Sequence, residues 1–251
     1  MDGEIRIIPV RDMPEVRPGD DLGEMIGDAL ARNGLELEDG DVVVVAQKVV
    51  SKAEGYLVTL AEVEPSALAE TFAQLYDKDA RKVEVVLREA RRVVRMERGV
   101  LIVETKHGFI CANAGIDESN VEGEEIVSLL PPDPDADARA IREALEARFD
   151  RRVAVIISDT FGRPWREGQT NIAIGVAGMM PLRSYIGQQD VFGYELRVTS
   201  LCVADELAGA AELVQGKVDK VPVAIVRGAA YDGGDGGAAE IVRPPERDLF
   251  R

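Results

Sequence analysis

Residues 153–178, VAVIISDTFGRPWREGQTNIAIGVAG, decide the fold of this chain. The first five residues are apolar and mostly β-branched, which predicts a strand buried on both faces. This strand carries Ser158, Asp159 and Thr160 to its carboxyl end, where α/β proteins commonly hold ligands. A loop rich in glycine and charge follows, and a second apolar run at 172–177 returns to the core. Such charge between two buried strands predicts a site for a charged ligand.

The composition is that of a globular protein without an extended nucleic-acid surface. The 251 residues are 46% apolar, enough for a substantial core in one large domain or two closely joined lobes. The formal net charge of −16 argues against nucleic acid as a partner, because phosphate binding along a duplex needs clustered Lys and Arg. A local basic cluster can still bind a small anion.

Cysteine and histidine usage excludes the usual zinc sites. Cys111 and Cys202 lie in apolar surroundings and are expected to be buried thiols in a reducing compartment. The single histidine, His107, is interpreted as a turn residue. No apolar run is long enough to span a bilayer and no signal-peptide pattern is present, so we expect a cytoplasmic protein without a membrane partner.

A second buried strand is also followed by charged residues. Residues 42–46 are fully apolar and are followed by Gln47, Lys48 and, four residues further, Lys52. The two lysines are candidates for neutralising phosphates as point charges. The alternative is that they are ordinary exposed lysines.

Three short groups of acidic, amide or hydroxyl residues are candidates for divalent cations, which prefer oxygen ligands. Asp159 and Thr160 are adjacent at a strand end, so they could address two metals, or a metal and a phosphate. The alternative is that Asp159 only caps the next turn. The other two groups are Asp117 with Asn120, and Gln215 with Gly216 and Lys217.

The central loop holds a further candidate for anion binding. Arg163 and Arg166 flank Trp165, a spacing suited to a forked grip on a carboxylate or phosphate beside an aromatic plane. The arginine-rich segment 88–98 is interpreted instead as a solvated face.

Helices and strands do not alternate regularly along the chain. Helices are expected at 21–33, 65–75, 80–89, 136–149 and 198–215, strands at 4–10, 42–46, 153–157 and 221–226, and a hairpin at 100–112. The P-loop pattern and the GxGxxG fingerprint are both absent. We therefore expect a mixed α+β fold with partly antiparallel sheets in two intimately joined lobes, unlike a P-loop or Rossmann fold.

Four blocks taken together resemble one known family, the coenzyme F420:L-glutamate ligases, or gamma-glutamyl ligases. They are QKVVSKAEG (47–55), ANAGIDESN (112–120), SDTFGRPWR (158–166) and VRPPERDLF (242–250). The blocks occur in order over essentially the whole chain, so residues 1–251 are expected to form a single gamma-glutamyl ligase module. Some bacteria fuse this module to a carboxyl-terminal flavin-binding domain, and no such extension is expected here.

The resemblance implies a GTP-dependent ligase with two divalent cations, magnesium or manganese, and potassium. GTP would convert the terminal carboxylate of the coenzyme precursor, F420-0, into an acyl phosphate, and L-glutamate would displace phosphate to form an amide. Further glutamate would be added through its γ-carboxylate. The resemblance also implies a homodimer. Two alternatives stay open: a metal-dependent phosphohydrolase and a non-catalytic GTP-binding protein.

The resemblance also assigns roles to individual residues. Asp117 and Asp159 would hold one metal, and Thr160 with Gln215 the other. Arg163 and Arg166 become candidates for the precursor's phosphodiester or the glutamate carboxylates. The residues expected to line GTP are Pro9, Val10, Arg11, Asp12, Gln47, Lys48, Lys52, Asn120, Gln215, Gly216 and Lys217.

Overall fold

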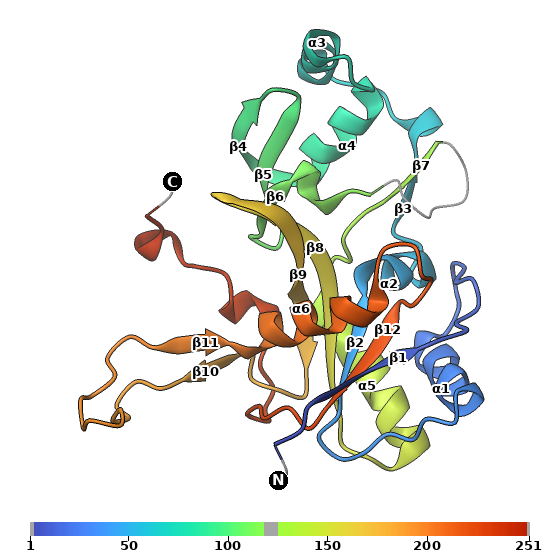
Figure 1. Ribbon diagram of the computed structural model, residues 1–251. Coiled ribbons are helices and arrows are strands. Elements are labelled where there is room, and N and C mark those ends of the chain that lie inside the picture. The colour runs from blue at the N-terminus through green and yellow to red at the C-terminus, as the bar shows by residue number, and fades with distance from the viewer. Residues whose placement is uncertain (1–2, 118–124, 250–251) are drawn as a thin grey trace.

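A five-stranded mixed sheet forms the centre of the molecule, with strand order β1-β12-β2-β8-β9 (Figure 1). The structure is a computed structural model that describes residues 3–117 and 125–249. The strands of this sheet are β1 Arg6–Val10, β2 Val42–Ala46, β8 Ala154–Arg163, β9 Arg166–Ala177 and β12 Val223–Arg227. Parallel and antiparallel pairs in one sheet, with helices packed beside it, confirm the expected α+β class.

Three strand ends meet at one side of this sheet. β12 runs antiparallel to both of its neighbours, β1 and β2, and β2 pairs in parallel with β8. The carboxyl ends of β1 and β2 and the start of β12 therefore lie side by side, level with Ser158 midway along β8, which continues beyond them. We call this side the carboxyl edge and define it by Val10, Ala46, Ser158 and Val223.

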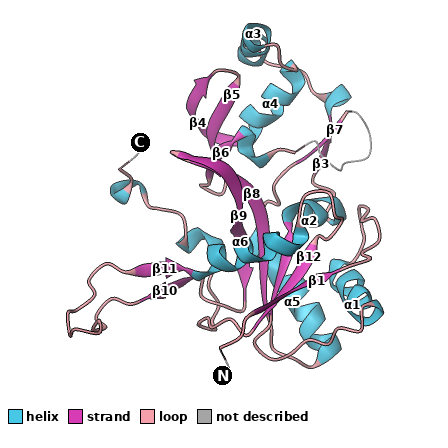
Figure 2. Cartoon of the chain, viewed as in Figure 1, coloured by secondary structure: helices cyan, strands magenta, loops and turns pink. Residues whose placement is uncertain are grey.

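Helices cover both faces of the central sheet (Figures 1 and 2). α6, Val203–Gln215, packs against all five strands. α5, Pro134–Phe149, packs on β8 and β9 from the other face, with α1, Leu22–Arg32, beside it. The first turn of α5 lies so close to β9 that a side chain at Gly175 would collide with Pro134. None of the helices in the described part of the chain combines the length and apolarity needed to cross a membrane.

A second group of elements forms what we call the small lobe, residues 57–117 and 125–130, drawn above the main sheet in Figure 1. Its core is separate from that of the main sheet and is built around Phe72, Val83 and Val103. It contains β3 Leu57–Thr59, β7 Ile126–Ser128, α3 Ala67–Tyr76, α4 Ala80–Glu89, β4 Ala90–Glu97, β5 Val100–Thr105 and β6 Ile110–Ala112.

The loop expected between the two core strands is instead the far half of a hairpin. β8 and β9 stay paired as far as Arg163 and Arg166, and only Pro164 and Trp165 form the turn. Cross-strand hydrogen bonds satisfy the backbone of this polar stretch, so it does not need to leave the sheet. The hairpin rises from the carboxyl edge toward the small lobe, where β8 contacts β6 (Figure 1).

Three further segments form elements that the sequence pattern alone does not specify. The charged residues after β2 form a helix, α2, Gln47–Ala53. The arginine-rich segment forms strand β4, and its arginines are exposed, as expected for a solvated face. The helix expected from residue 198 begins at Val203, because β11, Ser200–Cys202, pairs with β10, Leu182–Ser184.

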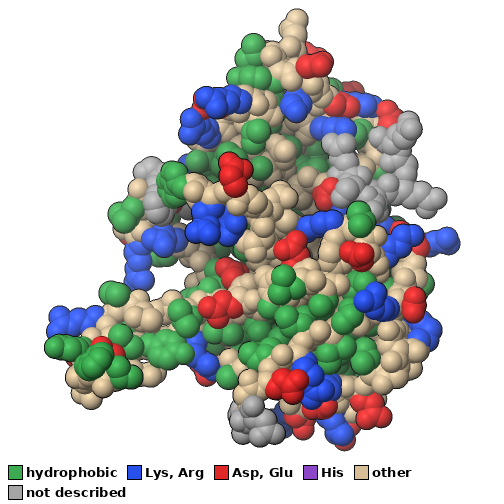
Figure 3. All heavy atoms as spheres, viewed as in Figure 1, with side chains coloured by type: hydrophobic (Ala, Val, Ile, Leu, Met, Phe, Trp, Pro, Cys, Tyr) green, Lys and Arg blue, Asp and Glu red, His purple; other side chains and the backbone are tan. Residues whose placement is uncertain are grey.

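Strands β10 and β11 project from the body as an arm (Figures 1 and 3). We define the arm as residues 182–202. Apolar side chains are exposed toward its tip, namely Ile186, Val191, Phe192, Tyr194 and Val198.

The two cysteines are free thiols. Cys111 is buried, as expected, whereas Cys202 is only partly covered, at the junction of β11 and α6. Burial raises the pKa of each thiol to about 12, so both stay protonated at neutral pH.

Candidate functional site

The carboxyl edge gathers most of the residues expected to form a site. Each strand that ends or begins there contributes polar residues: Arg11 and Asp12 after β1, Gln47 and Lys48 after β2, Asp159 and Thr160 on β8, and residues 215–222 before β12. This matches the general position of ligand sites in open sheets, at the carboxyl ends of parallel strands.

Asp117 reaches this edge from the small lobe. Its backbone forms a bridge with Ser128, with N–O distances of 3.2 and 2.9 Å. Its carboxylate extends to the main sheet, where Oδ2 lies 2.7 Å from Nζ of Lys48 in the first turn of α2. The ion pair therefore joins the small lobe to the end of β2.

Asp159 on β8 is partly buried, and the charges of Asp117 and Lys48 both act on its carboxyl group. Burial, and then the negative charge of Asp117, raise the pKa of Asp159 from 3.8 to about 6. The backbone N–H of Thr160 and the positive charges of Lys217 and Lys48 act in the opposite direction. The structure brings the two aspartates from separate lobes to one edge, because Asp117 pairs with Lys48, two residues after Ala46, whose register partner Ser158 directly precedes Asp159. A carboxylate in this kind of environment is typical of functional sites.

Thr160 belongs to a second polar group on the hairpin. Its hydroxyl donates to Asn171 Oδ1 on β9 at 2.7 Å, and Nζ of Lys217 donates to Thr160 Oγ1. The same Nζ lies 3.5 Å from Asn171 Oδ1 and 3.3 Å from Glu212 Oε1 on α6. The ammonium group of Lys217 is therefore surrounded by oxygen atoms from β8, β9 and α6.

Two buried polar atoms near the carboxyl edge, Gln215 Oε1 and Ser158 Oγ, have no hydrogen-bond partner among the residues that the structure describes. Gln215 is 4% exposed, and its Nε2 donates to the backbone oxygens of Val44 at 3.2 Å and Pro222 at 3.1 Å. These bonds fix the amide with its oxygen unpaired. A buried unpaired oxygen costs about 1–3 kcal/mol, so each of these two atoms is a position where a bound water or ligand would supply the missing hydrogen bond.

The donors at this edge suit a hard divalent cation. In the parts of the chain that the structure describes, no group of three or more Asp, Glu, His or Cys residues is placed to hold a metal. The available set consists of two carboxylates, a hydroxyl and an amide oxygen, from Asp117, Asp159, Thr160 and Gln215. Oxygen donors of this kind fit magnesium or manganese.

Several residues expected to line a nucleotide have other contacts here. Gln47 is 3% exposed, and its side-chain amide donates to the backbone oxygen of Leu129 at 2.8 Å, which ties α2 to the end of the small lobe. Lys52 is buried and pairs with Glu15. Asn120 lies outside the described residues.

The end of β1 presents mainly backbone to the carboxyl edge. Pro9 and Val10 belong to β1, and the side chain of Val10 is fully buried in the main core. Arg11 is held through its backbone by Asn33, whose Nδ2 donates to Arg11 O at 2.8 Å. Asp12 adopts a left-handed conformation with φ of 57°, which turns the chain away from the strand.

Arg163 and Arg166 lie at the tip of the hairpin and not beside Asp159. Trp165 between them is 82% exposed. Arg163 follows Asp159 by four residues along β8, about 13 Å at the usual rise of about 3.3 Å per residue. These arginines can therefore reach only the far end of a ligand whose other end lies at Asp159.

Asn171 and Glu212 belong to the polar group around Lys217, although no sequence motif marks them as site residues. Asn171 is 6% exposed and lies directly opposite Thr160 in the register of β8 and β9. Glu212 lies one turn before the end of α6. Only the register of the hairpin and the placement of α6 bring them to Lys217, so no local sequence signal could have identified them.

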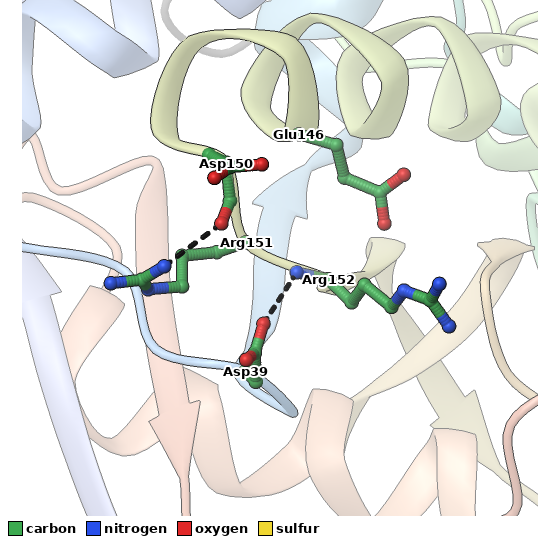
Figure 4. A pocket seen from close by; sticks show the side chains of 5 residues that line it. All are labelled: Asp39, Glu146, Asp150, Arg151 and Arg152. Carbon is green, nitrogen blue, oxygen red and sulfur yellow. Dashed lines mark hydrogen bonds between the residues drawn. The ribbon is translucent and has the colours of Figure 1, made fainter.

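A separate pocket lies at the other end of the sheet (Figure 4). It has a volume of about 280 Å³, and its residues precede β2 and β8. Its lining consists of Asp39, Glu146, Asp150, Arg151 and Arg152. It is therefore separated from Asp159 by the length of the buried strands.

Comparison with known proteins finds similarity to one family over nearly the full length of this chain. Residues 11–228 match the family described as F420-0:Gamma-glutamyl ligase. The chain is 45% identical over 250 residues to a coenzyme F420:L-glutamate ligase of Methanothermobacter thermautotrophicus, covering 98% of this chain and 99% of that one. It is 46% identical over 252 residues to the protein of the same name in Methanopyrus kandleri, covering 98% of both chains. Its identity to the namesake in Methanocaldococcus jannaschii is 44% over 216 residues, 86% of each chain.

Proposed function

This chain belongs to the F420-0:gamma-glutamyl ligase family, and from this premise we propose that it uses GTP and two divalent cations to join L-glutamate to F420-0. The γ-phosphoryl group of GTP is transferred to the terminal carboxylate of F420-0, which gives an acyl phosphate and GDP. The amine of glutamate attacks the acyl carbon, a C–N bond forms, the C–O bond to phosphate breaks, and the amine loses a proton. Further γ-linked glutamate is added by the same steps.

The observation that supports this proposal best is the meeting of Asp117 and Asp159 at the carboxyl edge. They come from different lobes, and they reach the same edge because Asp117 pairs with Lys48, two residues after Ala46, the register partner of Ser158. Phosphoryl transfer requires mainly positioning and charge neutralisation from the protein. An edge that joins carboxylates, lysines and unpaired oxygens supplies groups for both tasks.

The residues at this edge fit the proposed cations. Asp117 and Asp159 would hold one, and Thr160 with Gln215 the other. The buried Oε1 of Gln215, which has no partner within the described chain, fits a cation ligand because its amide is already fixed by two bonds from Nε2. When bound, magnesium or manganese supplies Lewis-acid stabilisation of phosphoryl oxygens. Potassium remains part of the proposal without an assigned site.

The nucleotide is proposed to lie across the ends of β1, β2 and β12. Val10 pairs with Val223, so the turn at Arg11 and Asp12 lies next to the segment 215–222. The backbone of these two segments, together with Lys48 and Lys217, would bind GTP. Gln47 and Lys52 would contribute by fixing α2, because their side chains already have protein partners.

A turnover assay tests the proposed reaction. GDP release is measured with GTP, Mn²⁺ and F420-0, with and without L-glutamate, and the product is identified by mass spectrometry. A ligase releases GDP in step with the glutamylated product and only when both substrates are present. Phosphate release without glutamate would indicate a phosphohydrolase, and tight GTP binding without turnover would indicate a non-catalytic GTP-binding protein.

We also propose a homodimer, in line with the sequence analysis. Its support is the arm, whose apolar tip includes Phe192 at 83% and Val191 at 93% exposure. Surfaces of this kind commonly mark protein–protein contacts. Light scattering of the wild type and of a Val191→Ser, Phe192→Ser variant tests this, and a monomeric wild type would reject it. The cytoplasmic location stays an expectation from the sequence.

A further inference from the structure

A lysine ammonium group contacts one proposed ligand of each cation. Nζ of Lys48 is 2.7 Å from Oδ2 of Asp117, a proposed ligand of the first cation. Nζ of Lys217 donates to Oγ1 of Thr160, a proposed ligand of the second cation, and lies 3.5 Å from Oδ1 of Asn171. One proposed ligand of each cation is therefore already in contact with a positive charge that belongs to the chain itself.

The two lysines reach these positions from opposite sides of the carboxyl edge. Lys48 extends from the first turn of α2, and Lys217 follows the end of α6 by two residues. Their side chains are 20% and 56% exposed. A lysine ammonium is a compact point charge on a flexible stem, so it can move by several ångströms without any change in the backbone.

Electrostatics explains why the site holds positive charge before any ligand arrives. Asp117 pairs with Lys48 beside the end of β2, and Asp159 directly follows Ser158, the register partner of Ala46 at that end. Two neighbouring carboxylates repel each other, and an ammonium group on one of them offsets that repulsion. The ion pair also bridges the lobes, because Asp117 belongs to the small lobe and Lys48 to α2 beside the main sheet.

We propose that Lys48 and Lys217 are positioning residues that stand in for the divalent cations, hold their oxygen ligands in place, and exchange with the cations when these bind. The displaced ammonium groups then turn to the phosphates of the nucleotide, which arrive with the cations. This inference rests on the proposed function, because it needs the two cation positions. It goes beyond that function because each lysine contacts first a cation ligand and then a phosphate of the nucleotide.

The exchange predicts effects of opposite sign on the two ligands. Removing the charge of either lysine removes a competitor, so the nucleotide-free protein binds Mn²⁺ more tightly. The same change removes a phosphate contact, so GTP binds less tightly. A lysine that only bound phosphate would leave Mn²⁺ affinity in the nucleotide-free protein unchanged. A lysine with only a structural role would lower the melting temperature and weaken both ligands.

The test measures Mn²⁺ binding to the nucleotide-free protein by electron paramagnetic resonance of free Mn²⁺. Lys48→Met and Lys217→Met are each expected to bind Mn²⁺ about twofold to fivefold more tightly than the wild type, the range expected from losing one partly exposed charged contact. Lys106→Met is the matched control, because Lys106 is also a paired lysine but contacts Glu89 at 2.9 Å on the small lobe. It should match the wild type. GTP affinity at fixed Mn²⁺, measured with a fluorescent analogue, should fall about tenfold in the two site variants.

Unchanged or weaker Mn²⁺ binding in both site variants, at wild-type melting temperature, would overturn the exchange. Lys48→Gln and Lys217→Gln provide the same comparison with a polar side chain if a methionine variant does not fold. The proposed cation sites have their own control in Asp159→Asn, which should lose Mn²⁺ binding. If the wild type binds no Mn²⁺, the cation sites are wrong and the exchange fails with them. If the wild type binds Mn²⁺ tightly, Asp159→Asn loses this binding and both lysine variants keep it unchanged, the cation sites stand and only the exchange is rejected.

Discussion

The two ends of the central sheet differ in whether their buried polar groups have hydrogen-bond partners. At the end where β2 begins, which we call the amino edge, Asp41 is 1% exposed and its two carboxylate oxygens accept hydrogen bonds from Arg227 at 2.8 and 2.7 Å. Arg227 also donates to the backbone oxygen of Glu36 at 2.6 Å. At the carboxyl edge, Gln215 Oε1 and Ser158 Oγ are buried without a partner in the described chain.

The difference separates a structural charge cluster from a functional one. Complete pairing compensates the desolvation of a buried charge, which is all that folding requires. Incomplete pairing is a cost to stability, which a bound ligand can offset. The amino edge therefore fastens β12 to β2, and the carboxyl edge is the candidate site. Four substitutions test this comparison.

The largest effect is expected for Asp159→Asn at the carboxyl edge. Loss of a cation ligand should lower kcat/KM for glutamate-dependent GDP release by about 10³-fold, equivalent to about 4 kcal/mol. The melting temperature at pH 7.5 should not fall, because burial and then the charge of Asp117 raise the pKa of Asp159 to about 6, which makes its ionised form unfavourable. A variant that unfolds, or one that keeps full activity, would contradict the assignment of this edge to function.

The reverse pattern is expected for Asp41→Asn at the amino edge. Removing one partner of a buried ion pair should lower the free energy of unfolding by about 3 kcal/mol. The folded fraction should keep wild-type kcat/KM, because the pair lies a strand length from Asp159. Urea unfolding and the GDP-release assay on the same preparation measure both quantities. A selective loss of activity at unchanged stability would break the distinction between the edges.

A smaller effect is expected at the hairpin tip, which extends the carboxyl edge. Arg166→Ala should raise KM for F420-0 or for L-glutamate about tenfold, the effect of losing one charge-assisted contact, while GTP binding stays intact. Arg151→Ala at the amino edge is the matched control, because Arg151 lines the pocket at the opposite end. Unchanged KM values for both substrates would remove the proposed role of Arg166.

The smallest effect is expected at Asp137, a partly buried carboxyl in the first turn of α5 whose Oδ2 has no partner in the described chain. Burial, then the charges of Glu54 and Asp133, raise its pKa from 3.8 to about 6. Because the folded pKa is higher than the unfolded value, this group stabilises the fold below about pH 4 and loses that contribution as pH rises through about 6.

Asp137→Asn should therefore leave stability unchanged at pH 4 and raise it by about 1 kcal/mol at pH 8. Urea unfolding of both proteins at the two pH values checks this. The result sharpens the comparison between the two edges. It tests whether a carboxyl with one unpaired oxygen lowers the stability of the fold at a place where no ligand is proposed. Equal stability of variant and wild type at pH 8 would show that this cost is already offset.

The periodicity of apolar residues was sufficient to predict those helices and strands that depend mainly on their own residues. The helix at 80–89 and the buried strands near 42–46, 153–157 and 221–226 follow from local apolar patterns. Pairing partners explain the failures. The polar residues 158–171 continue as strands because β8 and β9 satisfy each other's backbone, and residues 200–202 pair with β10 before the helix begins.

By itself, the sequence determined the chemistry available to this protein: carboxylates, an amide and lysines placed at the ends of buried strands, in blocks that resemble one ligase family. Only the tertiary structure decided which of these groups meet. Asp117 reaches Lys48 through the bridge to Ser128, and Asn171 reaches Thr160 through the register of a hairpin. The physical reason is that local residue patterns set burial and periodicity, whereas contacts between distant segments depend on how the lobes and strands pack.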